Sequence, residues 1–259
     1  MLKNLRTKFL ENRFLFSELV KRDFKKKYKR TYLGMIWSVL SPLLTLLVMR
    51  IVFTQFFGRG MDHYTIYLFC GNIVFSYFSE ATSSGMSSLM DNASIFSKVN
   101  VPKYLFLFSK NISSLINFGM TFVVFILFCI IDGVTFTPTF FALVFPILCL
   151  IIFNMGVGLI LSALFVFFRD IQYLWSIFTT LLMYLSAIFY TVDGYAPVVQ
   201  RLFLLNPVYV YIKYFRLAVL EGTLPSLQYH ALALGYALLA FGIGSVIYKV
   251  KNHKFLYYV

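Results

Sequence analysis

A series of apolar segments, each about as long as a membrane is thick, constrains this chain more than any other feature of its sequence. A hydrocarbon core of ~30 Å requires about 20 helical residues at ~1.5 Å each. Six segments meet this length, one of them marginally. They span residues 33–57, 64–84, 104–131, 140–168, 174–192 and 229–248. The sequence therefore predicts an all-α integral membrane protein with six transmembrane helices.

The composition excludes a soluble domain. Hydrophobic residues make up 60% of the 259 residues and charged residues only 13%, and the mean hydropathy is +0.80; such values do not describe a surface that faces water. The net charge of +13 does not indicate a nucleic-acid partner, because the basic residues cluster near the chain ends and in the loops between apolar segments. Membrane topology explains that distribution.

The same basic residues predict the orientation. One side of the predicted bundle carries the basic residues of positions 3–30 and those of later loops, namely Lys98, Lys103, Arg169, Lys249, Lys251 and Lys254. The other side carries Arg59, Arg201, Lys213 and Arg216. The positive-inside rule then places both termini in the cytoplasm, in a bacterial cytoplasmic membrane. Because charged residues persist to Arg30, a cleavable signal peptide is not expected.

Residues 1–32 predict a cytoplasmic amphipathic helix ahead of the first span. Its apolar face carries Phe16, Leu19, Val20 and Phe24. Its basic face carries Lys21, Arg22, Lys25 and Lys29. Such a helix is expected to lie along the membrane surface. It serves either as a topology anchor that binds anionic headgroups or as part of a gate, and the sequence leaves both roles open.

Residues 193–228, between the fifth and sixth predicted spans, contain two apolar pieces that are too short to cross a membrane as helices. The pieces, 198–205 and 208–220, are separated by Asn206-Pro207. Because backbone polar groups at membrane depth must be paired, the pattern predicts a re-entrant helical hairpin that turns at the Asn-Pro break. The alternative is a pair of helices lying at the outer membrane surface.

Three ionisable residues are notable inside the predicted spans, where charges are costly and often functional. Glu80 and Lys110 lie at similar depths near the cytoplasmic side, so we expect them to form an ion pair. Arg50 differs in depth from Glu80 by about 14 Å and has no acidic partner at its own level. It either reaches the outer headgroups or contacts an anionic substrate.

The residues that catalysis requires are not gathered anywhere in the sequence. His63, His230 and His253 are far apart, and no HExxH or paired-carboxylate motif occurs. The three cysteines lie inside apolar segments without metal-ligand spacing. A Walker A motif needs a Gly-Lys dipeptide, and the chain has none. We therefore expect no catalytic, cofactor or metal site in this chain, and any ATP is bound by a partner.

Several short motifs occur in the loops between the predicted spans and near the start of the first span. They are Arg22-Asp23-Phe24-Lys25, Tyr28, Leu33-Gly34, Trp37, Lys98-Val99-Asn100-Val101-Pro102, Phe168-Arg169-Asp170-Ile171 and Asn206-Pro207. In this order and placement the chain resembles, over essentially its whole length, the membrane subunits of type-2 ABC exporters that move lipid-linked polysaccharide, O-antigen or teichoic acid. One departure is Thr31-Tyr32, where such subunits often carry a serine two residues before the Leu-Gly.

The resemblance implies a homodimer of six-helix subunits with a substrate channel along the dimer interface. It also implies two copies of a separate ABC ATPase, which binds ATP and Mg, and a polyisoprenyl-pyrophosphate-linked glycan as substrate, besides contacts with membrane lipids. The small residues of Gly158-x-x-x-Ser162 and Ala231-x-x-x-Gly235 offer faces for close helix packing, either within one subunit or between two.

Three groups of site residues follow from the resemblance. The gate or substrate-headgroup residues are Arg22, Lys25, Lys26, Tyr28, Lys29, Arg30 and Trp37. The ATPase-coupling residues, centred on a loop at 87–103, are Asp91, Asn92, Phe96, Lys98, Pro102, Arg169 and Asp170. The channel or outer-gate residues, centred on 193–228, are Arg50, Tyr190, Asn206, Pro207, Tyr209, Lys213 and Arg216.

Each group also has a plainer interpretation. The first would bind only lipid headgroups, the second would be a solvated connector with a local ion pair, and the third would be an interfacial aromatic belt with snorkelling cations.

Two other functions compete with polymer export. An exporter of a small lipid or drug would share the fold, but the basic N-terminal helix and the lack of a large external domain favour a polymer. A membrane-embedded glycosyl or phosphate transferase would need clustered polar residues in one loop, which the sequence lacks. We therefore expect a permease subunit that exports O-antigen, capsule or teichoic acid polymer.

Overall fold

The computed structural model describes residues 12–28, 34–57, 61–99, 101–252 and 254–258. Over these residues the chain is helical and has no strand, which confirms the expected all-α class for the described part. The α-helices are α2 (Arg13–Tyr28), α3 (Trp37–Phe57), α4 (Tyr64–Asp91), α5 (Ala93–Phe96), α6 (Tyr104–Ile131), α7 (Val144–Phe167), α8 (Ile171–Leu185), α9 (Pro197–Phe203), α10 (Pro207–Val219) and α11 (Leu227–Lys251). The 3₁₀ helices are η1 (Gly34–Ile36), η2 (Pro138–Leu143) and η3 (Lys254–Tyr257).

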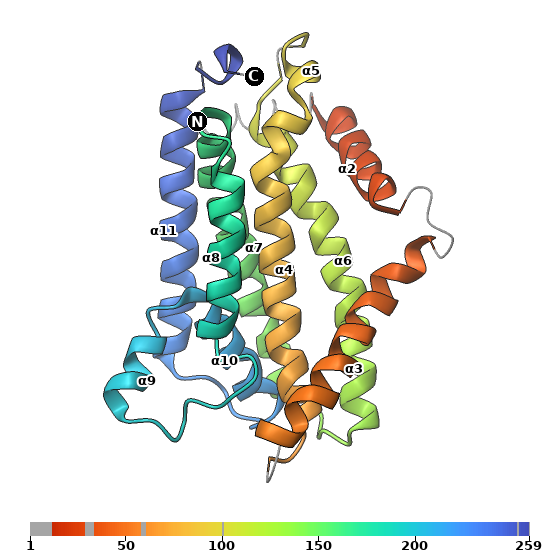
Figure 1. Cartoon of the computed structure of the whole chain (residues 1–259), viewed down its shortest axis with the longest axis vertical. Coiled ribbons are helices and arrows are strands. Elements are labelled where there is room, and N and C mark those ends of the chain that lie inside the picture. Colours follow the sequence, from red (N-terminus) through yellow and green to blue (C-terminus); the bar gives the residue numbers. More distant parts are fainter. Residues whose placement is uncertain (1–11, 29–33, 58–60, 100, 253, 259) are drawn as a thin grey trace.

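The long helices stand side by side, so the bundle has two distinct ends (Figure 1). α5 and η3 lie at one end, which we call the α5 end. α9 and α10 lie at the opposite end, which we call the α9 end. α3 is inclined against α4 and α6, while α2 packs on α6 toward the α5 end.

Four helical stretches are long and apolar enough to cross a membrane, which makes this a multi-pass membrane protein. They are Trp37–Thr54, Tyr104–Ile131, Pro138–Phe167 and Leu227–Lys251. The α9–α10 pair makes a fifth if it is counted as one bent span. The predicted count of six is not confirmed by this test. α4 has 28 residues but includes Asn72 and Glu80 among other polar side chains, and α8 is apolar but has only 15 residues.

The predicted helix boundaries agree best with the observed ones where the sequence carries a turn residue. α6 has the predicted bounds, since the chain turns directly afterwards at Gly133, whose φ is +74°. α4 runs past its predicted end at 84 to Asp91, because Gly85 and Ser88 pack inside the bundle instead of forming a loop. α8 stops at Leu185, well before the predicted 192, since the chain turns at Ala187 with a φ of +50°.

α4 forms the centre of the core. It packs against α6, α7 and α10, and twenty of its residues, most of them apolar, are buried. Aromatic rings fill the space around it: Phe69 meets Phe125 of α6 edge-on with ring centroids 5.4 Å apart, and Phe78 stacks near Phe153 of α7 at 5.9 Å. Because neighbouring helices pack around α4, its buried polar residues, such as Asn72, do not have to face lipid.

The break at Asn206-Pro207 divides α9 from α10, as predicted. The Asn206 side chain accepts hydrogen bonds from the backbone N–H groups of Val208 at 3.0 Å and Tyr209 at 3.4 Å, and Pro207 begins α10. This is a helix N-cap followed by proline, which starts a new helix where the previous one has ended. The two helix axes meet at 107°.

The α7–α11 contact is the tightest in the bundle. A Cβ atom added to Gly156 of α7 would lie 2.3 Å from the Phe241 nitrogen, and one added to Gly244 of α11 would lie 2.7 Å from the Gly156 carbonyl oxygen. Of the small residues that the sequence suggested, Gly158 packs within the chain against Leu107, whereas a Cβ on Gly235 would meet nothing within 4 Å. Glycine is required where the backbones touch.

Replacement of Gly244 by alanine is therefore expected to force α7 and α11 apart and destabilise the protein by about 1–3 kcal/mol. Gly242→Ala is the matched control on the same helix, because a Cβ there would meet nothing within 4 Å. Thermal unfolding in detergent should show a lower midpoint for Gly244→Ala alone. Equal midpoints for the two variants would contradict the close backbone contact.

Candidate functional site

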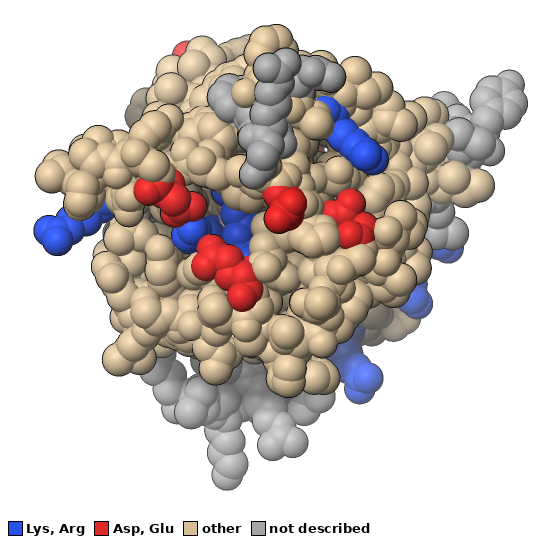
Figure 2. Space-filling model, turned by 90° about the horizontal axis from the view of Figure 1, so that it is seen from below, with Lys and Arg blue, Asp and Glu red and all other residues tan. Residues whose placement is uncertain are grey.

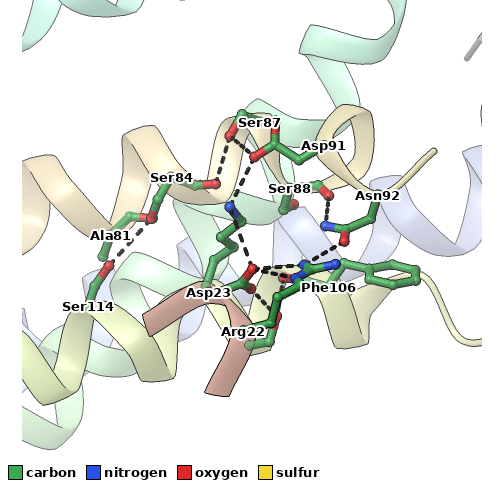
Figure 3. Close-up of polar contacts among 12 residues, drawn as sticks. Arg22, Asp23, Ala81, Ser84, Ser87, Ser88, Asp91, Asn92, Phe106 and Ser114 are labelled. Atoms are coloured by element: carbon green, nitrogen blue, oxygen red, sulfur yellow. Dashed lines mark hydrogen bonds and ion pairs between the residues drawn. The ribbon is translucent and has the colours of Figure 1, made fainter. Parts of the chain in front are cut away.

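A buried carboxylate on α2 gathers polar side chains at the α5 end (Figure 3). The Asp23 side chain is 3% exposed. Its Oδ1 accepts hydrogen bonds from Arg22 Nε at 3.1 Å and Nη2 at 2.7 Å, and its Oδ2 accepts one from Ser109 Oγ of α6 at 3.0 Å. A carboxylate is stable away from water only when its oxygens are paired in this way. Leu19, one turn earlier, is buried in the same apolar cluster as Phe106 of α6.

Lys110 of α6 joins Asp23 to the end of α4. Its Nζ lies 3.0 Å from Asp91 Oδ2 and 4.0 Å from Asp23 Oδ1, and its side chain is 13% exposed. Ser87 Oγ donates to the same Asp91 oxygen at 3.0 Å. The predicted ion pair between Glu80 and Lys110 is therefore wrong. α4 continues to Asp91 and α2 brings in Asp23, and both carboxylates lie nearer to the Lys110 amine.

Asn92 extends the network into the loop between α4 and α6. Arg22 Nη2 donates to Asn92 Oδ1 at 2.7 Å, and Asn92 Nδ2 donates to the Ser88 carbonyl at 2.7 Å. Asn92 is fully buried and separates α4 from α5. α2 is thus bonded to the point where the chain leaves α4 and starts the loop.

Burial makes this network a constraint on position more than a source of stability. Moving a pair of charges out of water costs about as much free energy as their attraction returns. Removing one partner of a buried pair, in contrast, destabilises a protein by about 3–5 kcal/mol. The shared lysine and the shared carboxylate thus link α2, α4 and α6 in the placement observed.

The predicted gate residues are placed in different ways. Arg22 belongs to the network, Lys25 and Lys26 are exposed on α2, and Trp37 begins α3 with 41% of its surface exposed. Lys29, Arg30 and the side chain of Tyr28 lie outside the described residues. Asp23 belongs to the Arg22-Asp23-Phe24-Lys25 motif but is not among the residues that the sequence predicts as sites. The signal that could identify it is an acidic residue on the same helix face as the apolar Leu19.

The predicted coupling residues divide into buried and exposed sets. Asn92 and Phe96 are buried inside the chain, so they hold the loop in place instead of offering a contact surface. Lys98 is exposed beside Val99. Arg169 and Asp170 are exposed in the turn between α7 and α8, and Pro102 is half-buried ahead of α6.

Lys103, at the end of the same loop, was not expected as a site residue. Its Nζ donates to the carbonyl oxygen of Asn252 and lies 5.7 Å from the ring centre of Phe96 and 5.6 Å from that of Phe255. Burial against these groups lowers the pKa of the Lys103 ammonium. The end of α11 and η3 are thereby attached to the loop as well.

At the α9 end, Arg216 is buried, with 3% of its surface exposed. Its Nη1 donates to Tyr67 Oη at 2.8 Å and to the Ala187 carbonyl at 2.9 Å, its Nη2 donates to the Ile188 carbonyl at 3.0 Å, and the guanidinium lies 3.4 Å from the centre of the Tyr67 ring. These contacts stabilise the left-handed turn that follows α8, and a role of Arg216 in an outer gate stays a prediction.

The remaining outer-gate residues surround this turn. Tyr209 is buried and Tyr190 half-buried, Asn206 donates to the Leu185 carbonyl at 3.1 Å, and Pro207 follows it. Lys213 pairs with Asp193 at 3.0 Å and Glu221 at 3.5 Å. Figure 2 shows acidic side chains gathered on this face around basic atoms. Arg50 is exposed on α3.

In the described part of the chain, no group of three or more His, Cys, Asp or Glu side chains is placed to hold a metal ion.

Comparison with known proteins gives one consistent similarity. The sequence model described as "ABC-2 type transporter" matches residues 15–220. The O-antigen export system permease protein RfbA of Myxococcus xanthus is 25% identical over 247 residues, covering 94% of each chain, and an RfbA of Klebsiella pneumoniae is 26% identical over 93% of this chain and 95% of its own. The polysialic acid transport protein KpsM of Escherichia coli is 23% identical over 91% of this chain and 92% of its own.

The network predicts that α2 loses its attachment when Asp23 is replaced. Asp23→Leu leaves Lys110 and Arg22 without their shared carboxylate, so amide hydrogen exchange across α2 should accelerate by about tenfold or more, the equivalent of ~1.4 kcal/mol. Glu18→Gln is the matched control, since Glu18 pairs with Lys21 at 2.9 Å on the exposed side of the same helix. Unchanged exchange in Asp23→Leu would show that α2 is held by apolar contacts alone.

Proposed function

Since this chain belongs to the ABC-2 type transporter family, we propose that it is the permease subunit of an exporter that moves a lipid-linked polysaccharide across the bacterial cytoplasmic membrane. The observation that supports this most is the similarity, over more than nine-tenths of each chain, to permeases named for O-antigen export and to a polysialic acid transporter. Those polymers are O-antigen and capsule types, and teichoic acid remains a further candidate.

The proposed subunit has six spans, with α4 and α8 added to the four apolar ones. α4 is long enough, at 28 residues or ~42 Å, and neighbouring helices bury twenty of its residues. α8 is shorter, and the buried turn around Ala187 continues it toward the α9 end. α9 and α10 are assigned to a re-entrant hairpin, with the α5 end and both termini in the cytoplasm. The excess of lysine and arginine in the loops of the α5 end supports that orientation.

The proposed active form is a homodimer with the translocation channel between its subunits. Within the described part of one chain, two apolar helix surfaces are largely exposed. On α8 only Thr179 is buried, while Tyr173, Ile177 and Leu181 are exposed. On α3 only 11% of the residues in the apolar stretch are buried. A second copy of the chain can cover both surfaces.

The energy source in this proposal is a separate ABC ATPase, present in two copies, which binds ATP and Mg. The chain contains no Gly-Lys dipeptide and so no P-loop of its own. The exposed residues Lys98 and Val99 offer the ATPase a contact on the loop after α4. Because Asn92 of that loop is bonded to Arg22, the network carries the motion of the loop to α2.

In the same proposal, α2 lies at the cytoplasmic membrane surface and receives the lipid-linked substrate. Its exposed side carries Lys21, Lys25 and Lys26, whereas Leu19 and Asp23 face α6. Ammonium groups suit the pyrophosphate that joins the polyisoprenoid to its glycan. An exporter of a small lipid or drug remains the alternative, because it would share the fold and the ATPase.

Depletion of this protein from cells tests the proposal. A polyisoprenyl-pyrophosphate-linked polymer should accumulate inside the cells while the amount of glycan on the surface falls, because synthesis continues after export stops. Lipid extracts and surface-glycan measurements report the two quantities, and re-expression of the wild-type chain is the control. Unchanged lipid-linked polymer together with normal surface glycan would contradict polymer export and favour a small lipid or drug.

A further inference from the structure

After α11 the chain turns back onto the loop that follows α4. The short helix η3 lies at the same end of the bundle as α5 (Figure 1). We call Asn252 and residues 254–258 the η3 segment. Phe255 of this segment has none of its surface exposed, and it belongs to the same apolar cluster as Phe96 of α5. The η3 segment is therefore packed into the bundle beside the loop.

Aromatic rings fix the η3 segment to α7 and α11. The centre of the Phe255 ring lies 5.8 Å from that of Phe167, the last residue of α7, and 5.2 Å from that of Tyr248 of α11. Tyr258 meets the Phe167 ring edge-on at 5.0 Å. The hydroxyl of Tyr248 shares a hydrogen bond with that of Ser162 of α7 at 2.7 Å. Aromatic pairs at these distances add to the stability that burial provides, so the segment is a fixed extension of the α7–α11 pair.

One side chain of the loop crosses to this segment. The Lys103 amine donates to the carbonyl oxygen of Asn252, and its Nζ lies 5.6 Å from the centre of the Phe255 ring. On the side of the loop itself, the same Nζ lies 5.7 Å from the centre of the Phe96 ring. An ammonium group over aromatic rings is attracted to their faces. Lys103 thus links the loop to the η3 segment and, through that segment, to α7 and α11.

The loop therefore has two attachments, and they differ in how costly they are to break. Toward α2 it is held by Arg22, which bonds Asn92 and the buried carboxylate of Asp23, and separating such charges leaves the carboxylate unpaired away from water. Lys103, in contrast, is only partly buried, so water replaces the Asn252 carbonyl when that contact opens. Burial against neutral groups also lowers the pKa of the Lys103 ammonium, so the closed contact disfavours its charged form. A displacement of the loop breaks the Lys103 contact first.

We propose that the η3 segment is a latch that holds the loop after α4 in its resting position and releases it during each transport cycle. Lys103 and Phe255 are its positioning residues, one on each side of the junction. The inference rests on the proposed function, because the loop is the proposed contact of the ATPase through Lys98 and Val99. It adds regulation to that contact. While the latch is closed, the loop resists the displacement that accompanies hydrolysis, so ATP hydrolysis without substrate is restrained.

The rate of ATP hydrolysis by the assembled exporter tests the latch. The chain is purified together with its ABC ATPase and placed in nanodiscs of phosphatidylethanolamine and phosphatidylglycerol, which contain no lipid-linked polymer. Lys103→Met keeps the length of the side chain but removes its charge and its donors. We expect kcat for ATP to rise by about three- to tenfold, because an open latch no longer restrains the loop. The KM for ATP should stay as in the parent, since ATP binds to the partner in this proposal.

Three further variants separate the latch from general damage to the fold. Phe255→Leu keeps an apolar side chain in the cluster but removes the ring face, so a smaller rise in kcat is expected. Lys103→Arg keeps the charge and the donors and should hydrolyse ATP at nearly the parent's rate. Lys254→Met is the matched control, because it removes an exposed positive charge next to Phe255 and should leave the rate unchanged. Elution volume, thermal midpoint and the amount of copurified ATPase identify the variants that are folded.

Spin labels give a second readout, which a loss of stability alone would not produce. Cysteines are introduced at Ser97 of the loop and Val250 of α11, both of which are exposed. Without ATP, the parent should show one narrow distribution of the distance between the two labels. Lys103→Met should show a broader or shifted distribution, whereas Lys254→Met should match the parent.

The latch is overturned if the folded Lys103→Met variant hydrolyses ATP at the parent's rate, if its label distances match those of the parent, or if Lys254→Met raises the rate equally. Those failures are distinct from failure of the proposed function. If an ATPase copurifies with the chain and depletion still traps lipid-linked polymer inside cells, export stands and only the latch falls. If no ATPase copurifies, or depletion traps no polymer, the proposed function falls and the latch falls with it.

Discussion

The buried carboxylate of Asp23 is the interaction on which the arrangement of the α5 end depends. It is shared by Arg22, Ser109 and Lys110, and Lys110 in turn reaches Asp91. One carboxylate on α2 therefore links three helices. Since such pairs return little net stability but cost much to break, they act mainly to hold α2, α4 and α6 in one relative position.

The same constraint recurs at two other polar groups in the interior of the bundle. Arg216 Nη1 and Nη2 donate to carbonyl oxygens and a tyrosine at the α9 end, and Glu80 of α4 accepts a hydrogen bond from Asn117 of α6. Lipid cannot supply these partners, so the chain supplies them itself. This need explains why the most polar long helix, α4, is also the helix that its neighbours enclose.

Sequence reasoning was accurate where a local signal exists. The bounds of α6 and the helix break at Asn206-Pro207 were predicted, because length, turn residues and an N-cap are all local. The end of α8 was missed, since the turn at Ala187 depends on Arg216, a residue far along the chain. The partners of Lys110 were also missed, because depth along a span says nothing about which neighbouring helix approaches. The coupling role of Asn92 and Phe96 stays a prediction, and their burial could be known only from the fold.

The central proposal is that α2 and the loop after α4 move as one unit when the proposed partner ATPase hydrolyses ATP. Spin labels on introduced cysteines at Lys26 and Ser97, both exposed, would report their separation in the assembled exporter with and without ATP, with a third label at Val250 of α11 as a reference. The three native cysteines are buried, which favours selective labelling. We predict that the distance from Lys26 to Ser97 stays constant while both positions shift relative to Val250. A change in the Lys26–Ser97 distance during turnover would contradict a rigid link through Asp23.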